Sequence, residues 1–290
     1  MSAMATMPSA TDVGPIVRAF YEQVSFPGYE EFETVMDLVR KAQEGAYARR
    51  LDEDVPLGVS ILDAGCGTGQ LATFLSLTHR HAVGVDFSLN SLRQGVAFKR
   101  RESLRNVHFV QMNLFASCLR TASFDYVFCN GVLHHTGDAF GGFRDLCRVL
   151  KPGGFIVIGL YNTYGRLFLD LRRLIFRLTG DRLQLLDYFM RRRSLGKAKK
   201  RIWFLDQYRN PHETKFAVAD VLRWFADCGI DYVNSVPPIN RRAVADGPLF
   251  ARRPVGTPLE HLMAQLGWIF TEGRVGGFFI IIGQKIGGTS

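Results

Sequence analysis

No stretch of this 290-residue sequence reaches the roughly 18 consecutive apolar residues that a membrane-spanning helix needs. The densest apolar cluster, Phe278 to Ile282, is only as long as a strand. The first 15 residues have neither a basic start nor an apolar block, so we predict no signal peptide. Five cysteines are present and none forms a CxxC pair, which argues against a structural zinc site. Free thiols are typical of a reducing compartment, so we expect a cytoplasmic protein without a metal site.

Acidic residues are in the minority, because 27 Asp and Glu stand against 36 Lys and Arg, for a formal net charge of +9. Residues 161–201 hold twelve of the basic residues and three of the acidic ones, so this segment carries the whole excess. Its basic residues are not interleaved with aromatic ones except near Trp203 and Phe204, and no RNA-binding module is recognisable. We therefore do not expect nucleic acid as a partner.

The apolar content of 47% and the charged content of 22% exclude a disordered or collagen-like chain. Short apolar runs alternate with helical stretches from residue 59 to residue 160, which is typical of a parallel α/β sheet. Strands are expected at 59–63, 82–86, 107–111, 124–129, 155–160, 230–236 and 277–286, with a Lys-Pro-Gly-Gly turn at 151–154. We predict one α/β domain over residues 1–290, with an amino-terminal helical cap at 1–50, a basic helical insertion at 161–212 and a second insertion at 237–274.

A glycine-rich loop, residues 65–69, closes the first predicted strand. Its three glycines let the backbone turn sharply and lie close to a ligand. Ligands of α/β sheets bind at this carboxyl edge, where Asp86 ends the next strand and can accept hydrogen bonds from ribose hydroxyls. Asn113 and Leu114 follow the third strand, where an amide can reach an adenine edge and an apolar side chain can pack on the ring. The loop and these side chains together predict a nucleoside-containing ligand.

Four motifs occur in order and resemble those of the class I S-adenosylmethionine-dependent methyltransferase family. They are Asp63-Ala-Gly-Cys-Gly-Thr-Gly69, Val83-Gly-Val-Asp-Phe-Ser88, Phe124-Asp-Tyr-Val-Phe-Cys-Asn-Gly-Val-Leu-His-His135, and Leu146 through Leu-Lys-Pro-Gly-Gly154. The resemblance covers about residues 59–160, and the Val-Leu-His-His turn is similar to that of the small-molecule enzymes. It implies a Rossmann-like seven-stranded sheet, six strands parallel and the last antiparallel, with S-adenosyl-L-methionine as the cofactor.

The resemblance also implies which residues bind this cofactor, since in the family the glycine loop holds the methionine moiety and the acid after the second strand holds the ribose. The matching positions are Asp63, Gly65, Cys66, Gly67, Gly69, Asp86, Phe87, Asn113, Leu114 and Asn130. The family commonly has Asp where this chain has Asn113, whose side-chain oxygen can still accept from the adenine amino group. A nicotinamide dinucleotide is the rival ligand, but Gln70 stands where its GxGxxG fingerprint needs a third glycine.

Methyl transfer from a sulfonium is a displacement, in which the enzyme mainly aligns the nucleophile and excludes water. A general base is needed only if the acceptor arrives protonated. His134 and His135 follow the fourth strand and titrate near neutral pH, and we favour His135 as the residue that faces the substrate. A structural role in the turn is the alternative for either histidine. Tyr161 and Asn162, at the end of the fifth strand, are the next candidates, and both also suit the opening of an insertion.

Two segments outside the sheet are candidates for the acceptor site. Tyr21 lies in a segment that closes over the cofactor in similar enzymes, although a helix merely packed on the sheet is the alternative. The polar segment 206–213, which includes His212, precedes a predicted helix. It either lines the acceptor pocket or begins that helix, with Glu213 near its first turn.

Residues 166–178 predict a basic amphipathic helix. One stripe holds Leu167, Leu171, Leu174 and Leu178, and the opposite arc holds Arg166, Arg172, Arg173 and Arg177. Two interpretations stay open. The helix is a lid whose apolar face covers the pocket and whose arginines are solvated, or residues 164–201 make peripheral contact with an anionic membrane. The second interpretation suits a lipid-like or quinone-like acceptor.

The sequence thus predicts an enzyme that moves a methyl group from S-adenosyl-L-methionine to O, N, S or C of a small or amphiphilic metabolite. The alternative is a non-enzymatic, cofactor-binding module associated with a membrane or a protein partner. The acceptor and the oligomeric state stay open.

Overall fold

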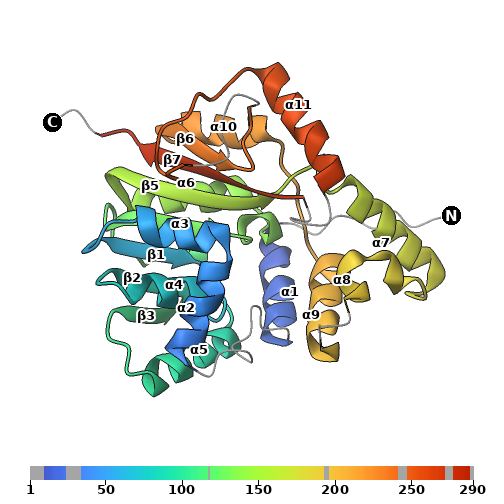
Figure 1. Cartoon of the computed structure of the whole chain (residues 1–290), viewed down its shortest axis with the longest axis horizontal. Coiled ribbons are helices and arrows are strands. Elements are labelled where there is room, and N and C mark those ends of the chain that lie inside the picture. Colours follow the sequence, from blue (N-terminus) through green and yellow to red (C-terminus); the bar gives the residue numbers. More distant parts are fainter. Residues whose placement is uncertain are drawn as a thin grey trace.

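A mixed sheet of seven strands runs through the computed structural model, which describes residues 10–23, 34–116, 118–192, 196–240, 247–271 and 277–287 (Figure 1). The strands are β1 (Ser60–Ala64), β2 (His81–Asp86), β3 (Val107–Gln111), β4 (Phe124–Asn130), β5 (Leu150–Tyr161), β6 (Ile230–Val236) and β7 (Phe278–Lys285). Their order is β3-β2-β1-β4-β5-β7-β6, and β7 is antiparallel to both of its neighbours. The predicted Rossmann-like sheet, with six parallel strands and an antiparallel last one, is confirmed.

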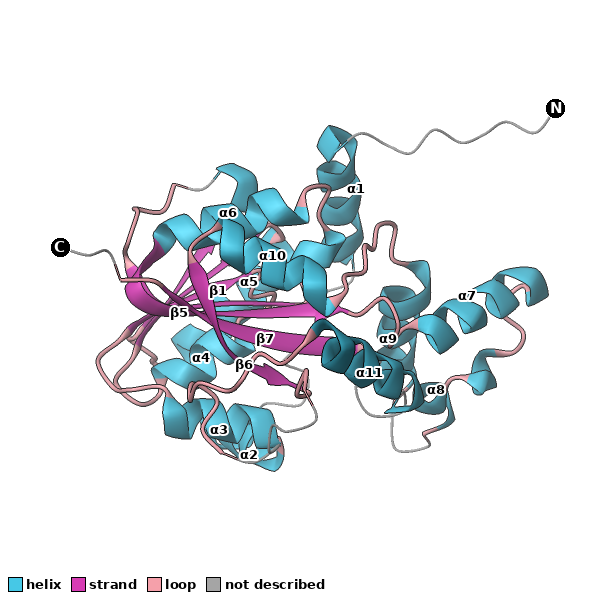
Figure 2. Cartoon of the chain, turned by 90° about the horizontal axis from the view of Figure 1, so that it is seen from above, coloured by secondary structure: helices cyan, strands magenta, loops and turns pink. Residues whose placement is uncertain are grey.

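Helices cover both faces of this sheet (Figure 2). Those between the strands are α4 (Gln70–Ser76), α5 (Leu89–Arg101), α6 (Ala139–Val149) and α10 (Val218–Asp227), with short 3-10 turns η1 (Leu114–Ala116) and η2 (Leu133–His135). Successive residues Ile61 and Leu62 are both fully buried, one in each of two apolar clusters. A strand buried on both faces is what a parallel sheet between two helical layers requires.

Three helices precede the sheet: α1 (Ala10–Gln23), α2 (Val35–Glu44) and α3 (Ala46–Asp54). The basic insertion contains α7 (Leu167–Thr179), η3 (Gln184–Leu186), α8 (Tyr188–Arg191) and α9 (Lys197–Arg209), and the second insertion contains α11 (Pro258–Trp268) and η4 (Ile269–Thr271). The predicted segments 1–50, 161–212 and 237–274 also include residues outside the described ranges, namely 1–9, 24–33, 193–195, 241–246 and 272–274. In the part of the chain that the structure describes, no helix combines the length and the apolar character needed to cross a membrane.

The fifth strand is longer than predicted, because the Lys-Pro-Gly-Gly segment 151–154 belongs to it. Leu150 pairs with Phe124, and pairing resumes only between Phe155 and Tyr126. The intervening residues form an irregularity in the ladder, with Gly153 at φ 76°. The predicted separate turn is therefore wrong. Glycine at positive φ and proline, which has no N–H to donate, are both tolerated in a bulge.

Helix α7 presents the opposite face to the one that its leucine stripe predicts. Leu171, Leu174 and Leu178 are exposed, whereas Arg166 is fully buried just before the helix. Leu169 and Phe176 supply the apolar packing of the helix, against Phe204 and Tyr208 of α9. The expectation of leucines over the pocket is therefore wrong. The expectation of solvated arginines is wrong for Arg166 and Arg173, whereas Arg177 is exposed. The physical reason is a buried acceptor for Arg166 and Arg173, which is described below with the site.

Candidate functional site

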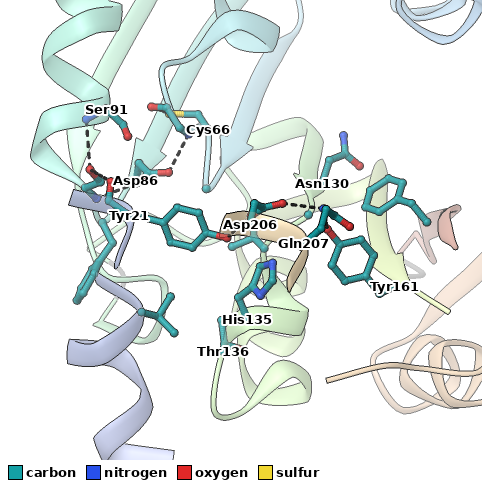
Figure 3. A pocket seen from close by; sticks show the side chains of 18 of the residues that line it. Tyr21, Cys66, Asp86, Ser91, Asn130, His135, Thr136, Tyr161, Asp206 and Gln207 are labelled. Atoms are coloured by element: carbon teal, nitrogen blue, oxygen red, sulfur yellow. Dashed lines mark hydrogen bonds between the residues drawn. The ribbon is translucent and has the colours of Figure 1, made fainter. Parts of the chain in front are cut away.

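A cavity of ≈ 1410 Å³ lies at the carboxyl ends of β1, β2, β4 and β5 (Figure 3). Its walls come from the glycine loop after β1, from α1 and from the basic insertion. Ligand pockets of proteins usually measure about 300–1,000 Å³, so this cavity has room for a cofactor and an acceptor together. It is lined by twelve of the sixteen predicted site residues: Asp63, Gly65, Cys66, Gly67, Asp86, Phe87, Asn113, Leu114, Asn130, His135, Tyr161 and Tyr21.

The glycine loop lies flat along one wall of the cavity. Gly65 has φ 73°, and a Cβ atom added to it would lie 2.2 Å from a methyl carbon of Val132. A Cβ on Gly69, at φ 78°, would lie 2.1 Å from the ring of Phe109. Both positions therefore require glycine. Gly65 and Gly67 line the cavity, whereas Gly69 packs behind the loop and is not one of the lining residues.

Two buried carboxylates flank this loop. Asp63 Oδ2 accepts a hydrogen bond from the backbone N–H of Ala72, at 3.2 Å, and burial raises the pKa of Asp63 to about 7. Asp86 accepts from the backbone N–H groups of Gly67 and Ser88, each at 2.8 Å. Burial raises the pKa of Asp86, and these backbone hydrogen bonds oppose the shift. A carboxylate oxygen has two lone pairs, so Asp86 can accept further hydrogen bonds from a ligand.

Side chains with apolar surface continue the wall beyond Asp86. Phe87 and Leu114 line the cavity, and the guanidinium carbon of Arg18 lies 5.0 Å from the centre of the Phe87 ring. Asn113 lines it too, and its Oδ1 atom accepts from the backbone N–H of Phe115 at 3.0 Å. This end of the cavity therefore offers both faces and polar edges to a planar ring.

The two adjacent histidines differ completely in their surroundings. His134 is fully buried, does not line the cavity, and has no hydrogen-bond partner among the described residues for either ring nitrogen. Burial, with His135 and Arg166 nearby, holds the pKa of His134 well below its ordinary value. His134 is therefore a neutral ring packed 4.0 Å, centre to centre, from Tyr161. Of the two predicted catalytic histidines, only His135 reaches the cavity.

His135 is held in one tautomer. Its Nδ1 atom lies 2.8 Å from the carbonyl oxygen of His212, and a carbonyl oxygen can only accept. In the neutral ring Nδ1 therefore carries the proton, and Nε2 keeps the free lone pair. Burial lowers the pKa of His135, and the Asp206 carboxylate nearby opposes this shift. A neutral imidazole with an unprotonated Nε2 is suited to accept a proton.

A chain of hydrogen bonds crosses the cavity beside His135 (Figure 3). The Tyr21 hydroxyl donates to one oxygen of Asp206, at 3.3 Å. The Gln207 amide donates to the other oxygen of Asp206, at 2.8 Å, and to the Tyr161 hydroxyl, at 3.0 Å. The sequence singled out the polar segment 206–213 but did not identify Asp206 and Gln207 as its cavity-lining members. Since both belong to α9, their orientation depends on a helix outside the sheet motifs.

Arg166 contacts two members of this hydrogen-bond chain, Tyr161 and Gln207. Its guanidinium carbon lies 3.6 Å from the centre of the Tyr161 ring, and Nη1 donates to the Gln207 side-chain oxygen at 3.1 Å. Nη2 donates to Glu213 at 3.2 Å, and Arg173 donates twice to the same carboxylate, at 2.9 and 2.6 Å. Burial would raise the pKa of Glu213, but the two guanidinium groups lower it. The alternative that segment 206–213 begins the helix, with Glu213 near its first turn, is wrong, because α10 begins only at Val218.

Two residues predicted to bind the substrate lie outside the cavity lining. Asn162 is fully buried, and its amide donates to the Phe216 carbonyl oxygen at 3.2 Å and to Gln265 at 2.9 Å. It therefore anchors the start of the insertion and has no access to an acceptor. His212 Nε2 lies 3.0 Å from the Thr136 carbonyl oxygen, so its ring braces the histidine turn. Its contribution is the backbone oxygen that orients His135.

Residues 62–158 match the family model described as a methyltransferase domain. This match spans the glycine loop, Asp86 and His135, which the structure brings to one cavity. The predicted resemblance to the class I S-adenosylmethionine-dependent methyltransferase family is thus confirmed over residues 62–158, about a third of the chain.

Curated relatives are similar to part of this chain. A demethylmenaquinone methyltransferase of Lactococcus lactis is 38% identical over 103 residues, which are 34% of this chain and 41% of the relative. An uncharacterised Synechococcus protein is 26% identical over 197 residues, 60% of this chain and 47% of the relative. The chain thus spans about half the length of the curated relatives that it matches.

Solved structures extend the similarity of fold over most of the chain. PKMT2 from Rickettsia typhi in complex with AdoHcy has a TM-score of 0.58 at 16% identity, covering 85% of this chain and 52% of that one. The [4+2]-cyclase SpnF has a TM-score of 0.53 at 15% identity, covering 99% and 100%. Identities this low show a shared fold and leave the reaction open.

The residues present fit S-adenosylmethionine. The glycine cradle and the Asp63 carboxylate suit the methionine moiety, whose ammonium group is cationic. The Asp86 carboxylate suits the ribose hydroxyls, and Phe87 and Leu114 suit the adenine faces. No phosphate site is needed for this cofactor. Among the described residues, no cluster of three or more His, Cys, Asp or Glu side chains is arranged to hold a metal ion.

Proposed function

We propose that this chain transfers a methyl group from S-adenosylmethionine to a small or amphiphilic acceptor, with His135 as the general base. One observation carries this proposal: a single continuous cavity has the cofactor-type residues at one end and His135, Tyr161 and Asp206 at the other. Its apolar lining outweighs a few convergent polar groups, which is the usual character of a small-molecule site. Demethylmenaquinone methyltransferases among the relatives support an acceptor with an aromatic head and an apolar tail.

The cofactor, when bound, supplies an electrophilic methyl group whose bonding pair stays on sulfur as the acceptor atom attacks. The task of the protein is to remove the proton from that atom and to align it. Nε2 of His135 accepts the proton, since Nδ1 is already committed to the His212 carbonyl oxygen. The Asp206 carboxylate stabilises the imidazolium that forms. The hydrogen-bonded chain Tyr21–Asp206–Gln207–Tyr161 limits the width of the cavity where the acceptor would bind.

The test is transfer of a labelled methyl group to a panel of hydroxylated aromatic, quinol-type and amine-bearing amphiphiles. We expect one class to be methylated in proportion to enzyme and time. His135→Gln should lower kcat by about 10²- to 10⁴-fold, the usual contribution of a general base, with cofactor affinity retained. His81→Gln is the matched control, because His81 is exposed at the start of β2.

Turnover of His135→Gln at the wild-type rate would disprove the base. Tight cofactor binding without transfer to any acceptor would favour the other candidate, a cofactor-binding module without catalysis. Because burial lowers the pKa of His135, we expect the acidic limb of the kcat profile, where His135 becomes protonated, to lie below the ordinary titration range of histidine.

A further inference from the structure

Two helices outside the matched methyltransferase domain carry apolar stripes that point into solvent. On α7 and α11, with η4, exposed side chains recur at helical spacing. We call this set the apolar ridge: Leu167, Phe168, Leu171, Leu174, Leu178, Leu259, Leu262, Met263, Leu266 and Phe270. Phe270 is 81% exposed and Leu178 is 78% exposed. A monomeric protein rarely leaves a contiguous apolar surface of this kind uncovered, so the apolar ridge marks an interaction site.

The two stripes join into one surface. The rings of Phe168 and Phe270 lie 6.5 Å apart, centre to centre, in an edge-to-face arrangement. Figure 1 shows α7 and α11 meeting at their ends, beyond the carboxyl edge of the sheet where the cavity lies. The apolar ridge is thus on the same side of the molecule as the proposed acceptor site.

Exposed basic residues accompany the apolar ridge. We call them the basic rim: Arg177, Arg182, Arg191, Arg192, Lys197 and Arg201. The acidic side chains of residues 166–201 are paired with basic residues or buried. Asp170 pairs with Lys215 and Asp181 with Arg209, while Asp187 is buried against the Tyr208 hydroxyl. The surface beside the ridge therefore presents positive charge.

The basic rim continues into the cavity. Tyr188, Arg191 and Arg192 line the cavity wall and are also exposed at the surface. A molecule held at the rim therefore has a direct route to His135, which lines the same cavity. This continuity matters for an amphiphile, because its apolar part need not cross bulk water on the way.

We propose that the apolar ridge and the basic rim dock this protein on an anionic lipid bilayer. The ridge inserts among acyl chains, and the rim contacts the lipid phosphates. A second copy of the chain fits less well, because two basic rims would come together across such an interface. The docking extends the proposed function by assigning the source of an amphiphilic acceptor.

Co-sedimentation of the full chain with vesicles of phosphatidylcholine, with and without phosphatidylglycerol, tests this proposal. No cofactor or acceptor is added, and cofactor binding is measured separately by calorimetry. A failure of docking is thereby distinguished from a failure of the proposed methyl transfer. We expect salt-sensitive binding to the anionic vesicles alone, since each cationic side chain near the surface contributes about fivefold in affinity.

Leu174→Gln combined with Leu178→Gln should weaken vesicle binding by at least about tenfold, because two leucines lose their place in the acyl region. Arg182→Gln combined with Lys197→Gln should weaken it by about 30-fold at low salt. Leu57→Gln and Arg93→Gln are the matched controls, because both residues are exposed away from α7, α9 and α11. The substituted positions of the ridge, the rim and the controls are all exposed. Folding should therefore be preserved, as circular dichroism would verify.

Three results would overturn the proposal. One is an absence of anionic-vesicle binding by the wild type. Another is equal weakening by the ridge variants and by Leu57→Gln. The third is a dimer in light scattering that the ridge variants dissociate, since a second copy of the chain would then be the occupant.

Discussion

Asp63 is a buried side chain whose protonation affects stability and the proposed cofactor binding. Burial raises its pKa to about 7 from an ordinary value of 3.8. The folded chain therefore holds the proton more tightly than the unfolded chain. Stability from this group is complete below pH 4 and is lost as pH rises through 7, by at most about 4 kcal/mol, since each pKa unit is about 1.4 kcal/mol. In the proposed cofactor complex, the cationic ammonium group would favour the ionised form of Asp63.

We therefore predict that Asp63→Asn makes the ligand-free protein more stable near pH 8 and weakens cofactor binding. Between pH 5.5 and 7 the wild-type affinity should rise with pH, because binding releases a proton from Asp63, whereas the variant should show no such rise. Calorimetry in two buffers of different ionisation enthalpy measures the released proton. Asp227→Asn, at an exposed position of α10, serves as the control. An unchanged slope in Asp63→Asn would show that a group other than Asp63 releases the proton.

At the scale of the element, buried charges rather than apolar spacing orient α7. The Glu213 carboxylate is 4% exposed and holds the guanidinium groups of Arg166 and Arg173. A buried charge left without its partner is much costlier than an exposed leucine. The network therefore holds the arginine side of α7 against the cavity and leaves the leucines outside.

Glu213→Gln should destabilise the protein by about 3–5 kcal/mol, because it removes the carboxylate that holds both the Arg166 and the Arg173 guanidinium groups. Thermal unfolding at neutral pH measures this loss. The lowered pKa of Glu213 means that its contribution is present above pH 4.5 and disappears as pH falls through its folded-state pKa, so the two proteins should converge in acid. Asp231→Asn is the control, since the exposed Asp231–Arg252 pair should contribute about 1 kcal/mol or less. Equal losses in both variants would contradict the network.

This network also explains why the orientation of α7 could not be predicted from the sequence. The strand positions and the glycine loop follow from local patterns, because strand periodicity and glycine spacing reflect the backbone directly. The antiparallel last strand was expected only from the resemblance to the methyltransferase family. The orientation of α7 depends on Glu213, 40 residues beyond Arg173 in the chain, and on Gln207 in another helix. Asn162 was misassigned for the same reason, since its partner Gln265 lies 103 residues away. Long-range polar partners leave no periodic signal in a single sequence.

At the scale of the whole molecule, α1 joins the two ends of the cavity. Glu22 accepts hydrogen bonds from the backbone N–H groups of Leu89 and Asn90 at the start of α5, which follows the cofactor-type residue Asp86. At the other end, the Tyr21 hydroxyl contacts Asp206 of α9 and Asn210 beyond it. One helix thus bridges the matched domain and the basic insertion.

Cofactor binding should therefore slow amide hydrogen exchange in α9 as well as in α1, although α9 lies outside the cofactor end. If cofactor binding stabilises one position of α1, the segments hydrogen-bonded to α1 unfold locally less often, and their amide hydrogens exchange more slowly. Tyr21→Phe removes the link to Asp206 and Asn210 while keeping the ring, so protection should persist in residues 10–23 and vanish in residues 197–209. Tyr164→Phe, at a tyrosine outside the α1–α9 link, is the control. If α9 stays protected in Tyr21→Phe, the insertion closes over the cofactor independently of α1, and the cavity ends are not coupled through this helix.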